Sequence, residues 1–246
     1  MKRQEAALLE HYRKLWYYNW HRYEGSNMVA MRLYFAEVLI GEIEEFLSLE
    51  GKSVLDVGGA RGEFCKTLSD LRHTFAVNLD PSYANSQFWT RAVKAYASQI
   101  PLPDNTFDLA ISRGVFEHIP PGARQHSLDE MFRVTKPGGF AYILIPPWFN
   151  PHAGHGFKPF HYFPFPLAKF LRKTVKRRKV GTRVRSYADA GLYPLTFRGM
   201  KKLIQNSGFE LAATKDTHFR LHFLTRVWLA NEILIPAVAF ILRKPL

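Results

Sequence analysis

The chain has 246 residues, 47% of them hydrophobic, which fits one α/β domain over residues 1–246. Lysine and arginine outnumber the acidic residues by 34 to 21, and the resulting net charge of +13 favours an anionic partner: nucleic acid, anionic lipid headgroups or a phosphorylated acceptor. The charged residues 1–5 lead into no apolar signal-peptide core, so we expect a cytoplasmic protein. The single cysteine, Cys65, excludes an internal disulfide and is expected to be a buried thiol.

Residues 4–49 are predicted to form two helices, separated at Gly25-Ser26-Asn27. The first helix is rich in aromatic residues, and the second carries apolar residues near a 3.6-residue period. We expect residues 1–50 to form a helical cap on the domain.

The segment 54–64 has the order of a buried strand, a turn of small residues and the start of a helix. Small residues let the backbone approach a ligand closely, and the helix behind them offers free N–H groups to an anion. The dinucleotide pattern G-x-G-x-x-G fails here, because Glu63 stands where its third glycine would be. The alternative is that this turn is an ordinary tight connection between a strand and a helix, with no ligand bound to it. The turn has an acid and three small residues at alternate positions: Asp56, Gly58, Ala60 and Gly62.

A second buried strand is predicted over residues 74–79 and ends at Asp80-Pro81. Asp80 follows Gly58 by about twenty residues, and an acid so placed at a strand's carboxyl end accepts both ribose hydroxyls of a nucleotide. We therefore assign Asp80 and Pro81 to a cofactor site. The alternative role for Asp80 is a helix N-cap before Ser82.

A third strand is predicted at 92–97, a fourth at 107–111 and a fifth at 140–145. The run Pro101–Asp108 is close to the signature LPF-x-DNSFD, and Lys136-Pro137-Gly138-Gly139 precedes the fifth strand. Together with the glycine loop, these segments resemble the class I S-adenosylmethionine (SAM) methyltransferases of the Methyltransferase-11-like family. Motif I of that family is an acid followed by G-x-G-x-G, and Ala60 replaces its central glycine.

The resemblance implies a Rossmann-like three-layer sandwich, with a seven-stranded, mostly parallel sheet whose last strand is antiparallel. It implies SAM at the carboxyl edge of the sheet, S-adenosylhomocysteine as the product, and a helical cap over the cofactor. Tyr18, His21 and Tyr23 are then candidates for ligand contact, although simple packing is the commoner role. The family's usual adenine-site acid falls at Tyr96, so recognition there would depend on the backbone, on aromatic contact or on Ala97 and Ser98.

The loop after the fourth strand lies beside the transferred methyl in relatives. There, Arg113 is placed to contact an anionic group, and His118 is either a general base or a packed helix residue. Residues 146–192 are read as a substrate-facing insertion after the fifth strand. Its His155 and His161 are further candidates for the base, with His155 favoured because glycines flank it. His152, His155 and His161 have no cysteine and few acids nearby, so we predict no metal site.

The remainder is predicted to form a helix at 196–206 capped by Thr196, a strand from 208, a helix at 221–232 and a last strand at 233–242. The last apolar run is too short to span a bilayer. The basic run 172–185 is either a solvated helix face or a contact for an anionic membrane surface.

We therefore expect a SAM-dependent methyltransferase, with O-methylation of a small or lipid-linked acceptor as the favoured reaction. The first alternative is an RNA methyltransferase, which the net charge permits although no RNA-binding module is evident. The second alternative is a SAM-binding scaffold or regulator without turnover, for which Ala60 and Tyr96 give some support.

Overall fold

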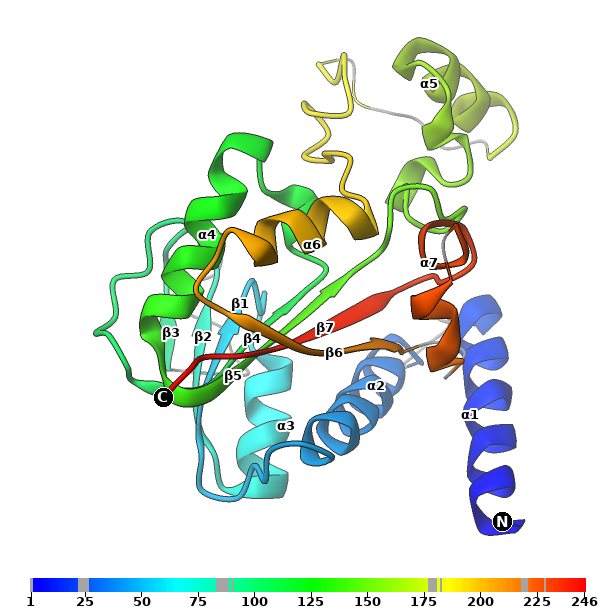
Figure 1. Cartoon of the computed structure of the whole chain (residues 1–246). Coiled ribbons are helices and arrows are strands. Elements are labelled where there is room, and N and C mark those ends of the chain that lie inside the picture. The colour runs from blue at the N-terminus through cyan, green and yellow to red at the C-terminus, as the bar shows by residue number, and fades with distance from the viewer. Residues whose placement is uncertain are drawn as a thin grey trace.

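The computed structural model describes residues 2–21, 27–82, 89, 91–176, 181, 183–217, 221–227 and 229–246. At its centre lies one seven-stranded sheet with helices on both faces (Figure 1). The strands are β1 (Ser53–Val57), β2 (Phe75–Leu79), β3 (Ala92–Val93), β4 (Phe107–Arg113), β5 (Thr135–Ile145), β6 (Glu210–Asp216) and β7 (Val238–Arg243).

The strand order is β3-β2-β1-β4-β5-β7-β6. Strands β1 to β5 pair in parallel, and β7 runs antiparallel to both β5 and β6. The expected sheet, mostly parallel with an antiparallel last strand, is confirmed. The order reverses between β1 and β4, and ligands of such sheets bind outside the carboxyl ends of the strands at that point.

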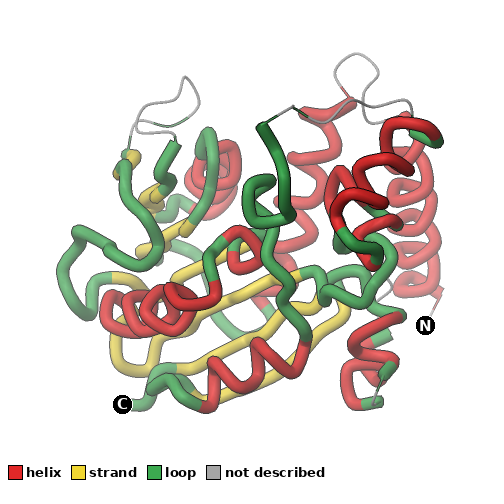
Figure 2. The backbone as a smooth tube through the Cα atoms, turned by 90° about the horizontal axis from the view of Figure 1, so that it is seen from above, coloured by secondary structure: helices red, strands yellow, loops and turns green. Residues whose placement is uncertain are grey.

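Helices form a layer on each face of the sheet, as the view from above shows (Figure 2). The α-helices are α1 (Lys2–His21), α2 (Asn27–Glu44), α3 (Glu63–Arg72), α4 (Pro121–Val134), α5 (Phe165–Thr174), α6 (Phe197–Gln205) and α7 (Ala230–Ile233). The 3-10 turns are η1 (Phe116–His118), η2 (His155–Phe157), η3 (Phe160–Tyr162) and η4 (His222–Arg226).

Each face of the sheet has its own apolar core. Side chains of α2 and α3 pack on one face, and those of α4 and α6 pack on the other. Burying one such large apolar side chain stabilises the fold by about 1.5–3 kcal/mol. Helix α2 is also fixed by a polar contact, because the buried Tyr142 of β5 donates a hydrogen bond of 2.9 Å to Glu42. Burial beside that carboxylate raises the pKa of Tyr142.

Helix α6 begins where the sequence predicts. Thr196 accepts a hydrogen bond of 2.9 Å from the backbone N–H of Gly199, which confirms it as the cap. The buried carboxylate of Glu232 also accepts from the first N–H groups of this helix, at Phe197 and Arg198. Cys65 is fully buried, as expected, and burial raises the pKa of its thiol.

Two predicted strands are shorter in the structure. The third strand ends at Val93 instead of Ala97, because its partner β2 ends at Leu79 and leaves the following residues without a neighbour to pair with. The last strand covers Val238–Arg243 instead of residues 233–242. It is hydrogen-bonded on both sides, so Pro236, which has no N–H, lies before it.

The predicted helix over residues 221–232 is wrong. The described part of this segment forms the short turn η4 and then the four-residue α7. Leu229, between them, has a φ of 69°, and this left-handed conformation interrupts a right-handed helix.

The insertion after β5 has a small core of its own, made by Phe157, Phe165 and Ala168, with Phe160, Val184 and Tyr187 packed against them. Helix α5 belongs to it and stands apart from the sheet (Figure 1). Within the described residues, no helix is both long and apolar enough to cross a membrane.

Candidate active site

The loop between β1 and α3 holds its small residues in left-handed conformations. The φ angles of Gly58, Ala60 and Gly62 are 76°, 49° and 79°. Alanine takes this conformation only at a cost of about 1–2 kcal/mol, so the fold must support the turn at Ala60. At Gly58 a side chain is also excluded by space, because a Cβ atom there would lie 2.3 Å from a methyl carbon of Val115. The loop is therefore pressed against the end of β4.

Asp80 ties the end of β2 to this loop. One carboxylate oxygen accepts a hydrogen bond of 3.1 Å from the N–H of Ala60. The other accepts one of 2.8 Å from Ser82, the contact expected of a cap. Asp80 is 9% exposed, and its neighbour Pro81 is partly exposed beside it. Because a carboxylate oxygen has two lone pairs, both oxygens keep capacity for further donors.

Asp56 and Arg113 meet behind the loop. Nη2 of Arg113 lies 3.4 Å from a carboxylate oxygen of Asp56, which is almost fully buried. Burial raises the pKa of Asp56 despite the opposing effect of the guanidinium. The guanidinium also lies over the ring of Phe64, 4.0 Å from its centre. Among the described residues, the buried Nε of Arg113 and Oγ of Ser112 have no hydrogen-bond partner.

A cavity of about 280 Å³ opens between this loop and α2. Helix α2 contributes Leu33, Phe35 and Ala36 to its wall, which includes neither Tyr18 nor His21 of α1. His21 instead stacks on Tyr17, with ring centres 4.8 Å apart. Tyr18 lies near the ring of Tyr34 in the neighbouring helix, and Tyr23 is outside the described residues. The remaining wall residues are Gly58, Gly59, Ala60, Glu63, Phe64, Thr67 and Arg113.

The segment after β3 places Ala97 and Ser98 in a turn. Ala97 is buried, Ser98 is partly exposed, and Tyr96 is 70% exposed. Tyr96 thus exposes its aromatic ring at the position where the family resemblance leads us to expect an acid. Whether the backbone, this ring or the hydroxyl of Ser98 contacts the adenine stays a prediction.

Two of the three candidate histidines come together at the carboxyl ends of β4 and β5. The rings of His118 and His155 are 4.8 Å apart. Nε2 of His155 also lies 3.3 Å from a carboxylate oxygen of Glu117. Sequence reasoning had missed Glu117, although its position beside His118 in the loop after β4 was the signal that could have found it.

The third candidate, His161, lies elsewhere. It is 2% exposed, and its Nε2 is 2.9 Å from the backbone carbonyl of Trp148, to which it donates. Burial lowers the pKa of His161 and favours the neutral ring. His152, at the surface of the same insertion, has a pKa that burial also lowers.

Comparison with known proteins identifies the family. A family model described as a methyltransferase domain matches residues 55–143. An uncharacterized methyltransferase of Mycobacteroides abscessus is 30% identical over 210 residues, which cover 81% of this chain and 79% of that protein. The chain belongs to the class I SAM-dependent methyltransferases.

Solved structures support the fold of this methyltransferase. The 1,6-didemethyltoxoflavin-N1-methyltransferase of Burkholderia thailandensis, solved with bound 1,6-didemethyltoxoflavin and S-adenosylhomocysteine, aligns with a TM-score of 0.54 and 15% identity, covering 100% of this chain and 91% of that one. A putative sarcosine dimethylglycine methyltransferase from Galdieria sulphuraria aligns with a TM-score of 0.56 and 14% identity, covering 88% and 87%.

SAM is the cofactor of the methyltransferase, and when bound it supplies an activated methyl group on a sulfonium. The residues at the loop fit such a group. The unpaired Nε of Arg113 is a buried donor beside the cavity, and Asp80 retains acceptor capacity at the end of β2. The small residues Gly58, Gly59 and Ala60 line the cavity itself, so a ligand there can approach the backbone of the loop.

Proposed function

We propose that the methyltransferase transfers its methyl group to a hydroxyl of a small or lipid-linked acceptor. The observation that carries this proposal is the cluster of Glu117, His118 and His155 beside the cofactor loop. The cluster begins two residues after Val115, the side chain that limits space at Gly58. A hydroxyl must lose its proton as the methyl arrives, and an imidazole titrates near neutral pH.

We assign the cofactor side to the glycine loop and to the ends of β2 to β4. Asp80 would hold the ribose, with Pro81 beside it. Arg113 would face an anionic group of the cofactor or acceptor, and its unpaired Nε supports this role. The other residues assigned to this side are Asp56, Gly58, Ala60, Gly62, Ala97 and Ser98.

We assign the base to His155, next to Glu117. His155 is 44% exposed at its side chain, so the imidazole is open to an acceptor, whereas His161 is enclosed by its own insertion. Glu117 is positioned to hold the imidazole and to stabilise its protonated form. No protein nucleophile is needed, because the acceptor oxygen attacks the methyl carbon directly and catalysis comes mainly from alignment.

The surface of the insertion supports a contact with anionic lipid. Leu167, Phe170 and Val175, on α5 and at its end, are exposed apolar side chains, and the basic residues Arg172 and Lys173 lie in the last turn of the same helix. Such a combination favours binding to the headgroup region of an anionic membrane. Arg177, Arg178 and Lys179 of the basic run 172–185 lie outside the described residues.

The reaction is tested by incubating the protein and a cell extract with SAM that carries a ¹³C-labelled methyl group. Mass spectrometry identifies the labelled product, and its ¹³C resonance distinguishes a methyl on oxygen from one on nitrogen or carbon. We expect a labelled methyl ether of a small or lipid-linked molecule. A label found on RNA, or on nitrogen alone, would contradict the proposal.

A further inference from the structure

We infer that Glu117, His118 and His155 together bind one divalent metal ion of the first transition row or zinc. Each residue offers one ligand atom, and the three atoms lie within 4.8 Å of one another. Tetrahedral ligands about 2.0–2.2 Å from a zinc ion stand roughly 3.3–3.6 Å apart. The 3.3 Å between Glu117 and Nε2 of His155 already matches this spacing. The ligand atom of His118 lies no more than 4.8 Å from the other two and would move closer to them when an ion binds.

Glu117 gives an independent indication of a missing partner. Its side chain is 4% exposed, and within the described residues neither carboxylate oxygen makes a hydrogen bond, although one of them lies 3.3 Å from Nε2 of His155. Leaving a buried carboxylate without hydrogen bonds costs several kcal/mol, so such groups are normally paired or bound to a metal. The nearby guanidinium of Arg124 interacts with Glu117 electrostatically but donates to backbone carbonyls instead.

His118 is held in the tautomer that a metal site requires. Its Nδ1 lies 2.5 Å from the backbone carbonyl of Gly191. A carbonyl only accepts, so Nδ1 carries a hydrogen, and in the neutral ring Nε2 then has its lone pair free. This bond from the second ring nitrogen to a carbonyl is the usual arrangement behind a metal-binding imidazole, where it fixes the orientation of the ring.

The surroundings hold the three ligands in place. The N–H of Tyr193 donates to the carbonyl of Glu117 over 2.8 Å, and Arg124 binds carbonyls on both sides of the contact, in the turn η1 and at residues 193 and 194. His155 has a φ of 44°, an uncommon conformation for a residue with a side chain, and such strain concentrates at functional sites. These hydrogen bonds thus fix the chain at the end of the insertion against the turn that follows β4.

Two imidazoles and one carboxylate form the ligand set of several catalytic zinc sites and of other open transition-metal sites. Both histidines are exposed while Glu117 is buried, so a bound ion would keep an open coordination position toward solvent. Magnesium and calcium prefer sets composed of oxygen and are a poorer match.

The role of the ion, unlike its binding, rests on the proposed O-methylation. An acceptor hydroxyl bound at the open position would have a lowered pKa and release its proton to water or buffer. The oxygen then bonds to the methyl carbon as the carbon–sulfur bond of SAM breaks, and S-adenosylhomocysteine leaves. His155 would in that case act as a ligand, with the cation replacing it as the group that activates the same oxygen.

The test is titration of the full-length protein, freed of metal by a chelator, with Co²⁺. We expect one equivalent to bind, with the visible absorption of four- or five-coordinate cobalt, and Zn²⁺ to displace it. Glu117→Gln, His118→Ala and His155→Ala should each weaken binding at least tenfold. His152→Ala, at the surface of the same insertion, is the matched control and should bind like the unaltered protein.

No stoichiometric binding, or unchanged affinity in all three variants, would overturn the inference. If Glu117→Gln fails to fold, the exposed His155 carries the test by itself. Calorimetry with SAM on the same samples separates the two proposals. SAM binding without cobalt binding refutes only the metal site, whereas cobalt binding in a protein that makes no methylated hydroxyl product refutes only O-methylation.

Discussion

The cofactor half and the histidine half of the sheet's carboxyl edge are built from different kinds of sequence. The cofactor half is centred on a short loop after β1 and the residues just after β2, which lie close together along the chain. Arg113, at the end of β4, joins them through its contact with Asp56. In the histidine half, Glu117 in the turn after β4 contacts His155, which lies nearly forty residues later in the insertion. His118 in the same turn is hydrogen-bonded to the carbonyl of Gly191. Local motifs therefore define the first half, and tertiary contacts define the second.

The largest change in SAM affinity is expected from a substitution at Asp80, which would weaken cofactor binding and leave the histidine half intact. Asp80→Ala removes two ribose hydrogen bonds to a charged acceptor, each worth about 1.5–3 kcal/mol, as well as the link to Ala60. We expect the affinity for SAM to fall at least about 100-fold in calorimetry. Asp70→Ala, in an exposed ion pair on α3, is the control. If SAM affinity is unchanged, Asp80 is only a cap for Ser82.

The basic run should affect the acceptor half without touching the cofactor. Neutralising Arg177, Arg178 and Lys179 together removes roughly 1 kcal/mol of attraction per residue to an anionic surface, up to about 100-fold in binding. Flotation with vesicles containing phosphatidylserine measures this loss, and vesicles of phosphatidylcholine alone are the control. SAM affinity should stay the same. Its collapse in a folded variant would mean that the insertion closes over the cofactor.

A substitution at His155 should affect the histidine half of the site and leave the cofactor half unchanged. His155→Ala should lower turnover at least about tenfold, a loss of roughly 1.4 kcal/mol of transition-state stabilisation, with little change in SAM binding. His152→Ala provides the control. Full turnover across pH 6 to 9 in the alanine variants of His118, His155 and His161 would show that neither a histidine base nor a histidine-bound cation takes part.

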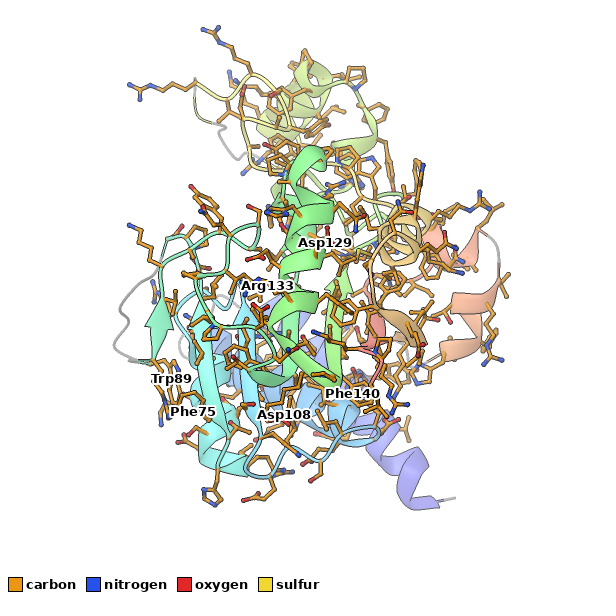
Figure 3. All side chains as sticks on the ribbon, turned by 60° about the vertical axis from the view of Figure 1, so that its left-hand side comes forward. Phe75, Trp89, Asp108, Asp129, Arg133 and Phe140 are labelled. Carbon is orange, nitrogen blue, oxygen red and sulfur yellow. The ribbon has the colours of Figure 1, made fainter. Side chains whose placement is uncertain are left out.

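The smallest effect is expected at Asp108, far from both halves. Figure 3 shows it at the edge of the sheet opposite the insertion. Burial alone would raise the pKa of Asp108, but hydrogen bonds from Ser53 and Lys136 lower it to about 2. Since the folded pKa lies below the unfolded value, the stabilisation is present above about pH 4 and is lost as the pH falls toward 2.

Asp108→Asn should therefore lower the free energy of unfolding by about 1 kcal/mol at pH 7, a figure reduced for solvent screening of a partly exposed group. Urea unfolding from pH 7 to pH 2 measures the difference, which should vanish at the acid end. Asp129→Asn, on the exposed side of α4, serves as control. If the two proteins differ by the same free energy of unfolding at pH 2 and at pH 7, then the packing of the side chain at position 108, and not its charge, accounts for the effect.

The same contrast explains what sequence could predict. The glycine loop, the place of Asp80 after a strand and the Thr196 cap follow from patterns within short segments. The mostly parallel sheet with its antiparallel last strand is instead what the family resemblance implies. The third strand could not be bounded, because Val93 ends it only where β2 ends. The role of Glu117 could not be predicted from the sequence for another reason. A single acid in a loop carries little signal until folding brings a histidine from the insertion to it and leaves its oxygens without hydrogen bonds.

The most direct test of the cofactor half is a calorimetric titration of the protein with SAM, S-adenosylhomocysteine and NAD. The account predicts one site per chain for each of the first two and no heat of binding for NAD, because the glycine spacing around Gly58 departs from the dinucleotide pattern. Tight binding of NAD, with no response to SAM, would contradict it.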